Sequence, residues 1–173
     1  MTLPADVLAD LRTDHAGETG AVWLYRGMRR VARDPALRAF AQRHQATEQA
    51  HLQRIEAWLP PAQRSRLLPL WRLAGWLTGA LPALWGPRAA YATVEAVERF
   101  VDGHYAQQIA RLQGQPALAA LRQTLVECRA DELAHRDEAA AARGPQPAGR
   151  WQRAWAGLVQ AGSQAAVAVC RHV

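Results

Sequence analysis

Two copies of the motif Glu-x-x-His could ligate metal ions in this chain. The copies are Glu48-Gln-Ala-His51 and Glu132-Leu-Ala-His135. On a helix, residues three positions apart share one face, so each copy can offer a carboxylate and an imidazole to the same site. Duplication of this motif is typical of helical bundles that hold two metal ions, in which the other two helices each add one inward-facing glutamate. The sequence therefore predicts a two-metal centre.

The two additional glutamates are available in the expected places. Glu18 shares an apolar helical stripe with Leu11 and Val22, and Glu98 is flanked by valines. A buried, unpaired carboxylate is costly, and coordination of a metal removes that cost. Glu95 lies on a face similar to that of Glu98, so spacing alone does not choose between them. The predicted ligand set, with this choice still open, is Glu18, Glu48, His51, Glu98, Glu132 and His135.

The types of the ligands narrow the choice of metal. An oxygen-rich site with one imidazole per ion suits iron or manganese, whereas structural zinc favours cysteine. Cys128 and Cys170 fit neither a zinc motif nor a disulfide framework, which favours a reducing compartment. Asp131 is a candidate acceptor for the N–H of a ligand histidine from a neighbouring helix. Asp131, Asp14 and Asp137 can equally be exposed helix charges.

Helical periodicity predicts the elements that must position these ligands. We expect helices over about residues 4–33, 36–59, 88–112, from beyond 116 to 143, and 149–171. Asp34-Pro35 suits a helix start, and Pro60-Pro61 cannot continue a helix. Two helix pairs joined by one long connection are the ferritin-like variant of the four-helix bundle. The predicted fold is therefore all-α, with residues 1–173 in a single domain, a long apolar crossover over 61–87 and an extra helix over 149–171.

The crossover is unusually apolar and carries three tryptophans between Leu67 and Gly86. Arg72 interrupts this segment, Pro69 and Pro82 are expected to break a helix there, and the uncharged remainder is shorter than the ~20 residues of a membrane span. Tryptophans around a short apolar segment suit a membrane interface. The alternative is a buried crossover that packs on the bundle. The last helix, with its own tryptophans and arginines, could serve either purpose.

The net charge of +6 comes almost entirely from arginine. It fits an anionic membrane or a solvated basic face, and without a recognisable motif we expect no nucleic acid partner. The sequence contains no Gly-x-Gly-x-x-Gly motif, so reductant is expected from a partner or by direct reaction at the site. The first ten residues have no basic stretch followed by an apolar run, so no signal peptide is expected.

Five segments in order resemble the demethoxyubiquinone hydroxylase family, the di-iron monooxygenases of ubiquinone biosynthesis. The resemblance extends from about Leu11 to the last helix. The segments are Asp14-His-Ala-Gly-Glu-Thr-Gly-Ala21, Glu48-Gln-Ala-His-Leu52, Leu68-Pro-Leu-Trp71, Val97-Glu-Arg-Phe-Val-Asp-Gly-His-Tyr105 and Asp131-Glu-Leu-Ala-His135.

This resemblance implies a reaction and a set of roles. The family's third-helix ligand stands seven residues before the tyrosine of a His-Tyr pair, here His104-Tyr105, which selects Glu98 over Glu95. Two iron ions would insert one oxygen atom from O2 into a demethoxylated polyprenyl quinone, with Tyr105 and His104 near the substrate. Because this substrate lives in the bilayer, the resemblance favours the membrane interpretation of the crossover.

The resemblance also implies partners and a location. Relatives form homodimers and, in mitochondria, work with a lipid-binding accessory protein, and an electron donor is needed. With its Ala- and Arg-rich composition and no visible transit peptide, the chain is expected to be a bacterial peripheral protein at the cytoplasmic face of the inner membrane. Three alternatives remain: a ferritin-like protein that oxidises or stores iron, a di-iron oxygenase of another lipid or quinone, and a metal-free helical membrane adaptor.

Overall fold

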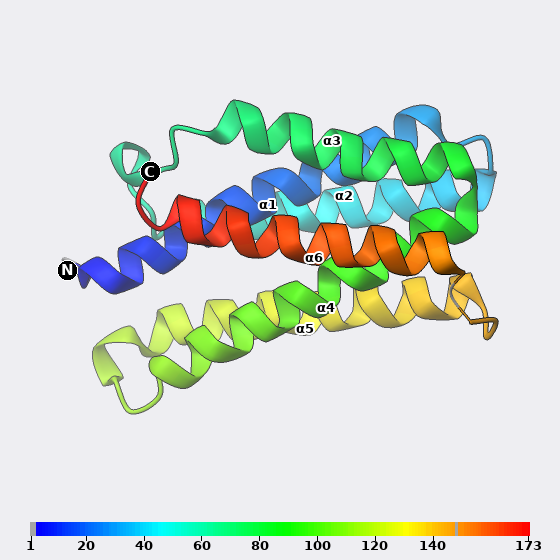
Figure 1. The fold of residues 1–173 in the computed structure, drawn as a ribbon. Coiled ribbons are helices and arrows are strands. Elements are labelled where there is room, and N and C mark those ends of the chain that lie inside the picture. The colour runs from blue at the N-terminus through cyan, green and yellow to red at the C-terminus, as the bar shows by residue number, and fades with distance from the viewer. Residues whose placement is uncertain (1–2, 148) are drawn as a thin grey trace.

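Long segments rich in alanine and leucine, separated by proline and glycine, form the helices of this protein. The computed structural model describes residues 3–147 and 149–173. Within these residues the chain forms helices and no strand, so the predicted all-α fold is confirmed (Figure 1). The elements are α1 Ala5–Val31, α2 Pro35–Glu56, η1 Pro61–Gln63, α3 Leu68–Trp85, α4 Pro87–Arg111, η2 Pro116–Leu118, α5 Ala119–Arg143 and α6 Arg150–Cys170.

The ends of the helices follow from local chemistry. The Asp34 carboxylate accepts a hydrogen bond of 2.8 Å from the backbone N–H of Leu37 and caps α2, which begins at Pro35. Gly86 has φ of 119° between α3 and α4, and Gly144 has φ of 79° after α5. Only glycine adopts such values without strain, so these positions can change the direction of the chain abruptly.

The helices α1, α2, α4 and α5 form the predicted ferritin-like bundle, with α1 beside α2 and α4 beside α5. Its core consists of two apolar clusters. One contains Tyr25, Phe40 and Tyr91, and the other contains Leu11 and Tyr105. The buried glutamates and histidines of α1, α2, α4 and α5 form a polar layer between the two clusters. The bundle therefore holds a hydrophilic centre with packed apolar cores on both sides.

The crossover contains an 18-residue helix, α3, so the prediction that Pro69 and Pro82 break it is wrong. Pro69 lies in the first turn, where its missing N–H is not needed, and α3 continues through Pro82 to Trp85. α3 lies against α1 at backbone contact. A Cβ atom added at Gly75 would overlap the backbone of Gly20, and one added at Gly79 would overlap the carbonyl oxygen of Leu24.

The opposite face of α3 is apolar and exposed. Its leucines recur every three or four residues and therefore lie on one side of the helix: Leu70, Leu73, Leu77, Leu81 and Leu84. α6 also exposes apolar side chains, with Trp151 89% exposed, and Cys170 is its one buried residue among those described. Among the described residues, no helix combines the length and the apolarity that crossing a bilayer requires. One face of the crossover thus packs on the bundle, as the alternative interpretation expected, and membrane contact by the exposed face stays a prediction.

Polar contacts at both of its ends hold α6 against the bundle. Near its start, the indole N–H of Trp155 donates a hydrogen bond of 2.9 Å to Thr93 of α4. At its end, Arg12 of α1 donates to the carbonyl oxygen of Arg171 at 3.0 Å, and Arg171 pairs with Asp10. α6 therefore lies beside α4 and α1 as a cover attached at both ends (Figure 1).

The close approach of α1 and α3 makes a prediction about stability. Gly79→Ala should lower the free energy of unfolding by about 1–3 kcal/mol, because the added methyl group forces two helix backbones apart. Gly157→Ala is the matched control, since a Cβ there meets nothing within 4 Å. It should raise stability by up to about 1 kcal/mol through helix propensity. Urea unfolding followed by circular dichroism at equal metal content measures both, and equal effects would contradict the backbone contact.

Candidate metal centre

The structure brings all six expected ligands together in the polar layer. They come from four helices and are all buried: Glu18 from α1, Glu48 and His51 from α2, Glu98 from α4, and Glu132 and His135 from α5. They form two groups of four. Within each group, one ligand atom per residue lies within 4.8 Å of the others. The first group is Glu18, Glu48, His51 and Glu132, and the second is Glu48, Glu98, Glu132 and His135. Glu48 and Glu132 thus belong to both groups.

Several buried polar atoms at the centre lack a hydrogen bond of suitable geometry, as expected where a cation binds. Both oxygens of Glu48, one oxygen each of Glu18 and Glu132, and Nδ1 of His135 are buried without a hydrogen bond of suitable geometry to any described residue. Buried polar atoms in native proteins nearly always have partners. Four carboxylates and two imidazoles can neutralise two divalent cations, and these atoms are of the types that iron and manganese prefer. The donor set therefore fits a two-metal centre.

Two buried tyrosines connect the halves of the bundle across this centre. Tyr25 of α1 donates a hydrogen bond of 2.8 Å to Glu98 of α4, and Tyr105 of α4 donates one to Glu18 of α1. Each tyrosine follows the glutamate of its own helix by seven residues, and each contacts the glutamate of the other helix. Sequence reasoning gave Tyr25 no role, although the repeated seven-residue spacing carried the signal.

The imidazoles of the two groups have different surroundings. Asp131 accepts from Nε2 of His51 at 3.0 Å, the position in which such a carboxylate orients a ligand histidine. His135 instead contacts the ring of His44, with the ring centroids 4.1 Å apart. Nε2 of His44 lies 3.0 Å from Glu138, and sequence reasoning missed this pair because neither residue belongs to a motif. The two candidate metal positions are therefore inequivalent.

Several candidate residues lie elsewhere. Glu95 pairs with Arg143 and Arg99, which leaves Glu98 as the glutamate of α4 that enters the centre. Asp137 is exposed beside Arg136, as expected if it is only an exposed helix charge.

Burial and mutual repulsion set the protonation of the metal-free centre. Burial and the charges of Glu132 and Glu48 raise the pKa of Glu18 and of Glu98 well above the ordinary carboxyl value. For Glu48, burial acts in the same direction, but the neighbouring His135 and His51 outweigh it and lower the pKa to about 2. The adjacent carboxylates, opposed by burial, raise the pKa of His135 to about 9 and that of His51 further. Metal binding must therefore release protons.

A largely apolar cavity of about 420 Å³ connects the centre to the surface covered by α3 and α6. Carboxylates of Glu18, Glu48, Glu98 and Glu132 form its inner end. Its walls consist mostly of small or apolar residues: Ala16, Gly17, Gly20, Ala74, Gly75, Val97, Phe100, Leu158, Gly162 and Ala166. A cavity with this lining suits an apolar molecule.

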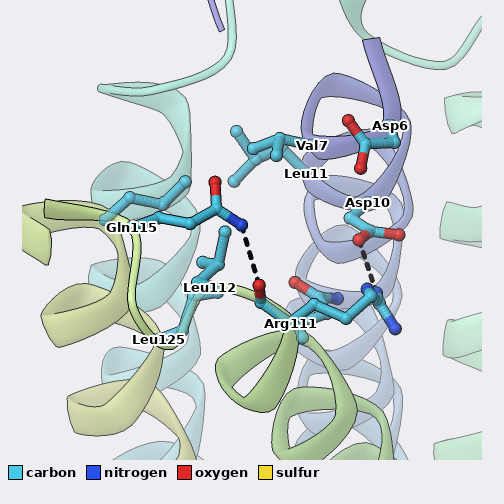
Figure 2. Close-up of a pocket in the computed structure, with 10 residues that line it drawn as sticks. Asp6, Val7, Asp10, Leu11, Arg111, Leu112, Gln115 and Leu125 are labelled. Carbon is cyan, nitrogen blue, oxygen red and sulfur yellow. Dashed lines mark hydrogen bonds and ion pairs between the residues drawn. The ribbon is translucent and has the colours of Figure 1, made fainter. Parts of the chain in front are cut away.

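One wall of this cavity is polar. Asp14 accepts from Gln108 at 2.6 Å and lies 3.1 Å from Nε2 of His104. Burial raises the pKa of Asp14, and the contact with His104 opposes that rise. Gln108 also lines a second pocket of about 260 Å³ between the start of α1 and the turn from α4 to α5, where Asp10 and Arg111 face each other (Figure 2). The two cavities are thus separated by this polar wall.

Known proteins are similar to this chain in sequence. The profile of a family described as "Ubiquinone biosynthesis protein COQ7" matches residues 6–170. The chain is 40% identical over 130 residues to the 3-demethoxyubiquinol 3-hydroxylase of Rhodospirillum rubrum, covering 73% of this chain and 60% of that protein. It is 36% identical over 132 residues to the mitochondrial NADPH-dependent 3-demethoxyubiquinone 3-hydroxylase of Rattus norvegicus, with the same coverage.

A third relative is the mitochondrial 5-demethoxyubiquinone hydroxylase of Saccharomyces cerevisiae, 33% identical over 147 residues, or 75% of this chain and 63% of that protein. The chain therefore spans about three fifths of the length of the curated relatives it matches.

The raised pKa of Glu98 predicts that its replacement stabilises the metal-free protein and weakens metal binding. A carboxyl group with a raised folded-state pKa takes up a proton on folding, so its contribution to stability falls as pH rises above about 4.5. Glu98→Gln has no such titration. The metal-free variant should melt higher than the metal-free wild type by at least about 2–4 °C at neutral pH, and this difference should grow with pH. It should also bind less metal.

Glu95→Gln is the matched control, because Glu95 lies on the same helix but pairs with arginines. It should leave metal content unchanged and should not stabilise the metal-free protein. Calorimetry over a pH series with metal analysis measures all three proteins. A metal-free Glu98→Gln variant less stable than the wild type at every pH would contradict the argument.

Proposed function

Because the chain belongs to the family of the ubiquinone biosynthesis protein COQ7, we propose that it is a di-iron monooxygenase. This membership confirms the family predicted from the sequence. The proposed reaction is hydroxylation of the ring of a demethoxylated ubiquinone precursor, with O2 and two reducing equivalents. One observation carries the proposal: a buried set of four glutamates and two histidines presents its four glutamates to an apolar cavity. A quinone ring can reach the ligands there without crossing water.

In this proposal each group of ligands would hold one iron ion. Glu18 and His51 would belong to one ion, Glu98 and His135 to the other, and Glu48 and Glu132 to both. When bound, the irons supply the redox chemistry that activates O2. The chain's own residues fix the geometry, since Tyr25, Tyr105 and Asp131 each hold a ligand by a hydrogen bond.

The cavity would bind the substrate with its ring at the carboxylates. Phe100 and Val97 form an apolar wall for the ring, and Tyr105 and His104 lie within reach of it. The polyprenyl tail would leave between α3 and α6, where Trp71 and Leu158 line the cavity. This path excludes water from the ring and keeps an apolar tail in apolar surroundings.

The exposed leucines of α3 continue this path to the exterior. We propose that they and Trp151 of α6 contact the membrane that holds the substrate, with arginines meeting anionic headgroups. A peripheral position at the cytoplasmic face of a bacterial inner membrane suits this arrangement. A homodimer, a lipid-binding accessory protein and a separate electron donor stay predictions from the resemblance.

The first experiment measures metal and product together. After anaerobic loading, the chain should bind about two iron ions. With a demethoxylated quinol, reductant and O2, mass spectrometry should show a product heavier by one oxygen atom. Iron without this product would favour iron oxidation or another substrate. No iron after any loading would favour the metal-free adaptor and contradict the proposal.

A cavity-filling variant tests where the ring binds. Gly17 lies beside Glu18 in the cavity wall, and a Cβ there meets nothing within 4 Å. Gly17→Leu should therefore fold and bind iron normally, but kcat/KM for the quinol should fall by about tenfold or more because the side chain occupies the ring's place. Gly157→Leu, which lies outside the cavity wall, is the control and should keep its activity. Equal activity in both variants would contradict binding of the ring beside Gly17.

A further inference from the structure

A carboxylate and an imidazole face each other in the wall of the substrate cavity. The side chain of Asp14 is fully buried, and that of His104 is 18% exposed. Nε2 of His104 lies 3.1 Å from Asp14 and 3.0 Å from Thr13. Both Asp14 and His104 line the cavity that ends at the ligand carboxylates. The metal centre makes no use of this pair.

Hydrogen bonding assigns the proton on the His104 ring. The hydroxyl of Thr13 already donates to the carbonyl oxygen of Asp10 at 2.6 Å, so it faces His104 as an acceptor. The Asp14 carboxylate is an acceptor too. The amide nitrogen of Gln108, which donates to Asp14, also lies 2.8 Å from Nε2 of His104 and is the one possible donor facing it among the described residues. With Thr13 and Asp14 both facing Nε2 as acceptors, Nε2 is assigned the N–H and Nδ1 the lone pair. Nδ1 forms no hydrogen bond with a described residue, and the ring lies in the cavity wall.

We propose that His104 is the base that accepts the proton of a ring hydroxyl from the quinol substrate, with Asp14 as its positioning residue. This inference rests on the function proposed above. The O–H bond of the quinol breaks, its electron pair stays on the oxygen, and the proton forms an N–H bond at Nδ1. The quinolate that results is richer in electrons than the neutral quinol and is oxidised more readily. The Asp14 carboxylate balances the charge of the imidazolium.

The surroundings of Asp14 suit this role. One of its oxygens accepts from Gln108 and faces His104, and the other is buried without a partner. A carboxylate without water is stabilised strongly by a neighbouring cation, so proton transfer to His104 is favoured. In the metal centre, by contrast, the carboxylates face the ligand imidazoles and would face the metals.

The second pocket lies close to the Asp14–His104 pair. Gln108 contacts Asp14 on one side and lines this pocket on the other. The pocket's volume of about 260 Å³ is enough for several water molecules, and Asp6, Asp10 and Arg111 make it polar (Figure 2). Water can therefore approach within one side chain of the pair without entering the apolar cavity.

Several other ionisable groups share the cavity with His104, and each helix around it must be considered in a pH profile. α3 contributes none among the described residues that line the cavity. The groups are Asp14 and Glu18 of α1, Glu48 of α2, Glu98 and Tyr105 of α4, Glu132 of α5 and Cys170 of α6. Among the described residues that line the cavity, His104 is the one histidine. Its replacement should therefore remove the acidic limb of the pH–rate profile.

The kinetic test uses the iron-loaded full chain. His104→Gln should lower kcat/KM for the quinol by about 10²- to 10⁴-fold, the usual contribution of a general base. The acidic limb of the wild-type profile should disappear, and iron content should stay unchanged. Asp14→Asn should keep the acidic limb and should lower kcat/KM less than His104→Gln does. His172→Gln, at an exposed position near the chain end, is the matched control and should behave as the wild type.

A second readout needs no turnover. The probe is 4-nitrophenol, whose ionised form absorbs visible light. At a pH where the free probe is mostly neutral, the wild type and His172→Gln should bind it in the ionised form, and His104→Gln should bind it neutral. Ionised probe in the His104→Gln variant, or an unchanged acidic limb, would overturn the proposal.

The two proposals fail in different ways. If the wild type makes no hydroxylated quinone, the proposed function fails, and the nitrophenol measurement still reports on His104. If the wild type is active but His104→Gln keeps its pH profile, only the role of His104 fails.

Discussion

Four buried carboxylates that face one another are the constraint on which this structure depends. Glu18, Glu48, Glu98 and Glu132 lie in the middle of a bundle whose two ends are apolar cores. Without cations, their mutual repulsion and burial oppose folding, and protons must compensate. The apolar clusters on both sides supply the stability that allows such a layer to exist. The fold therefore acts as a frame that holds a charged centre away from water.

The centre repeats the same residue types in its two halves, but the surroundings of the halves differ. Each half contributes a glutamate, a Glu-x-x-His pair and a tyrosine that reaches the opposite half. The surroundings then diverge, since His51 contacts the carboxylate of Asp131 whereas His135 contacts the ring of His44. Such outer contacts tune ligand basicity, so two equivalent motifs yield two inequivalent positions.

The cavity exists because small residues meet where α1, α3 and α6 come together. Gly20 and Gly75 let two helix backbones touch, while Gly17 and Gly162 leave open space in the cavity wall. Glycine thus has two opposite uses within a few turns of helix. At one level it closes the gap between α1 and α3, and at another it keeps room for a ligand beside Glu18.

The sequence by itself predicted the candidate ligands, and it determined the family and the four helices of the bundle. Glu-x-x-His is a local pattern, and helical periodicity converts its spacing into a shared face without any tertiary information. The helix of the crossover was not foreseen, because proline was weighed without regard to its place in the first or last turn. Only the tertiary structure decided the contacts across helices: Tyr25 with Glu98, His51 with Asp131, His44 with His135, and Asp14 with His104. These contacts depend on the rotation and height of one helix against another, which side-chain packing sets and local periodicity does not encode.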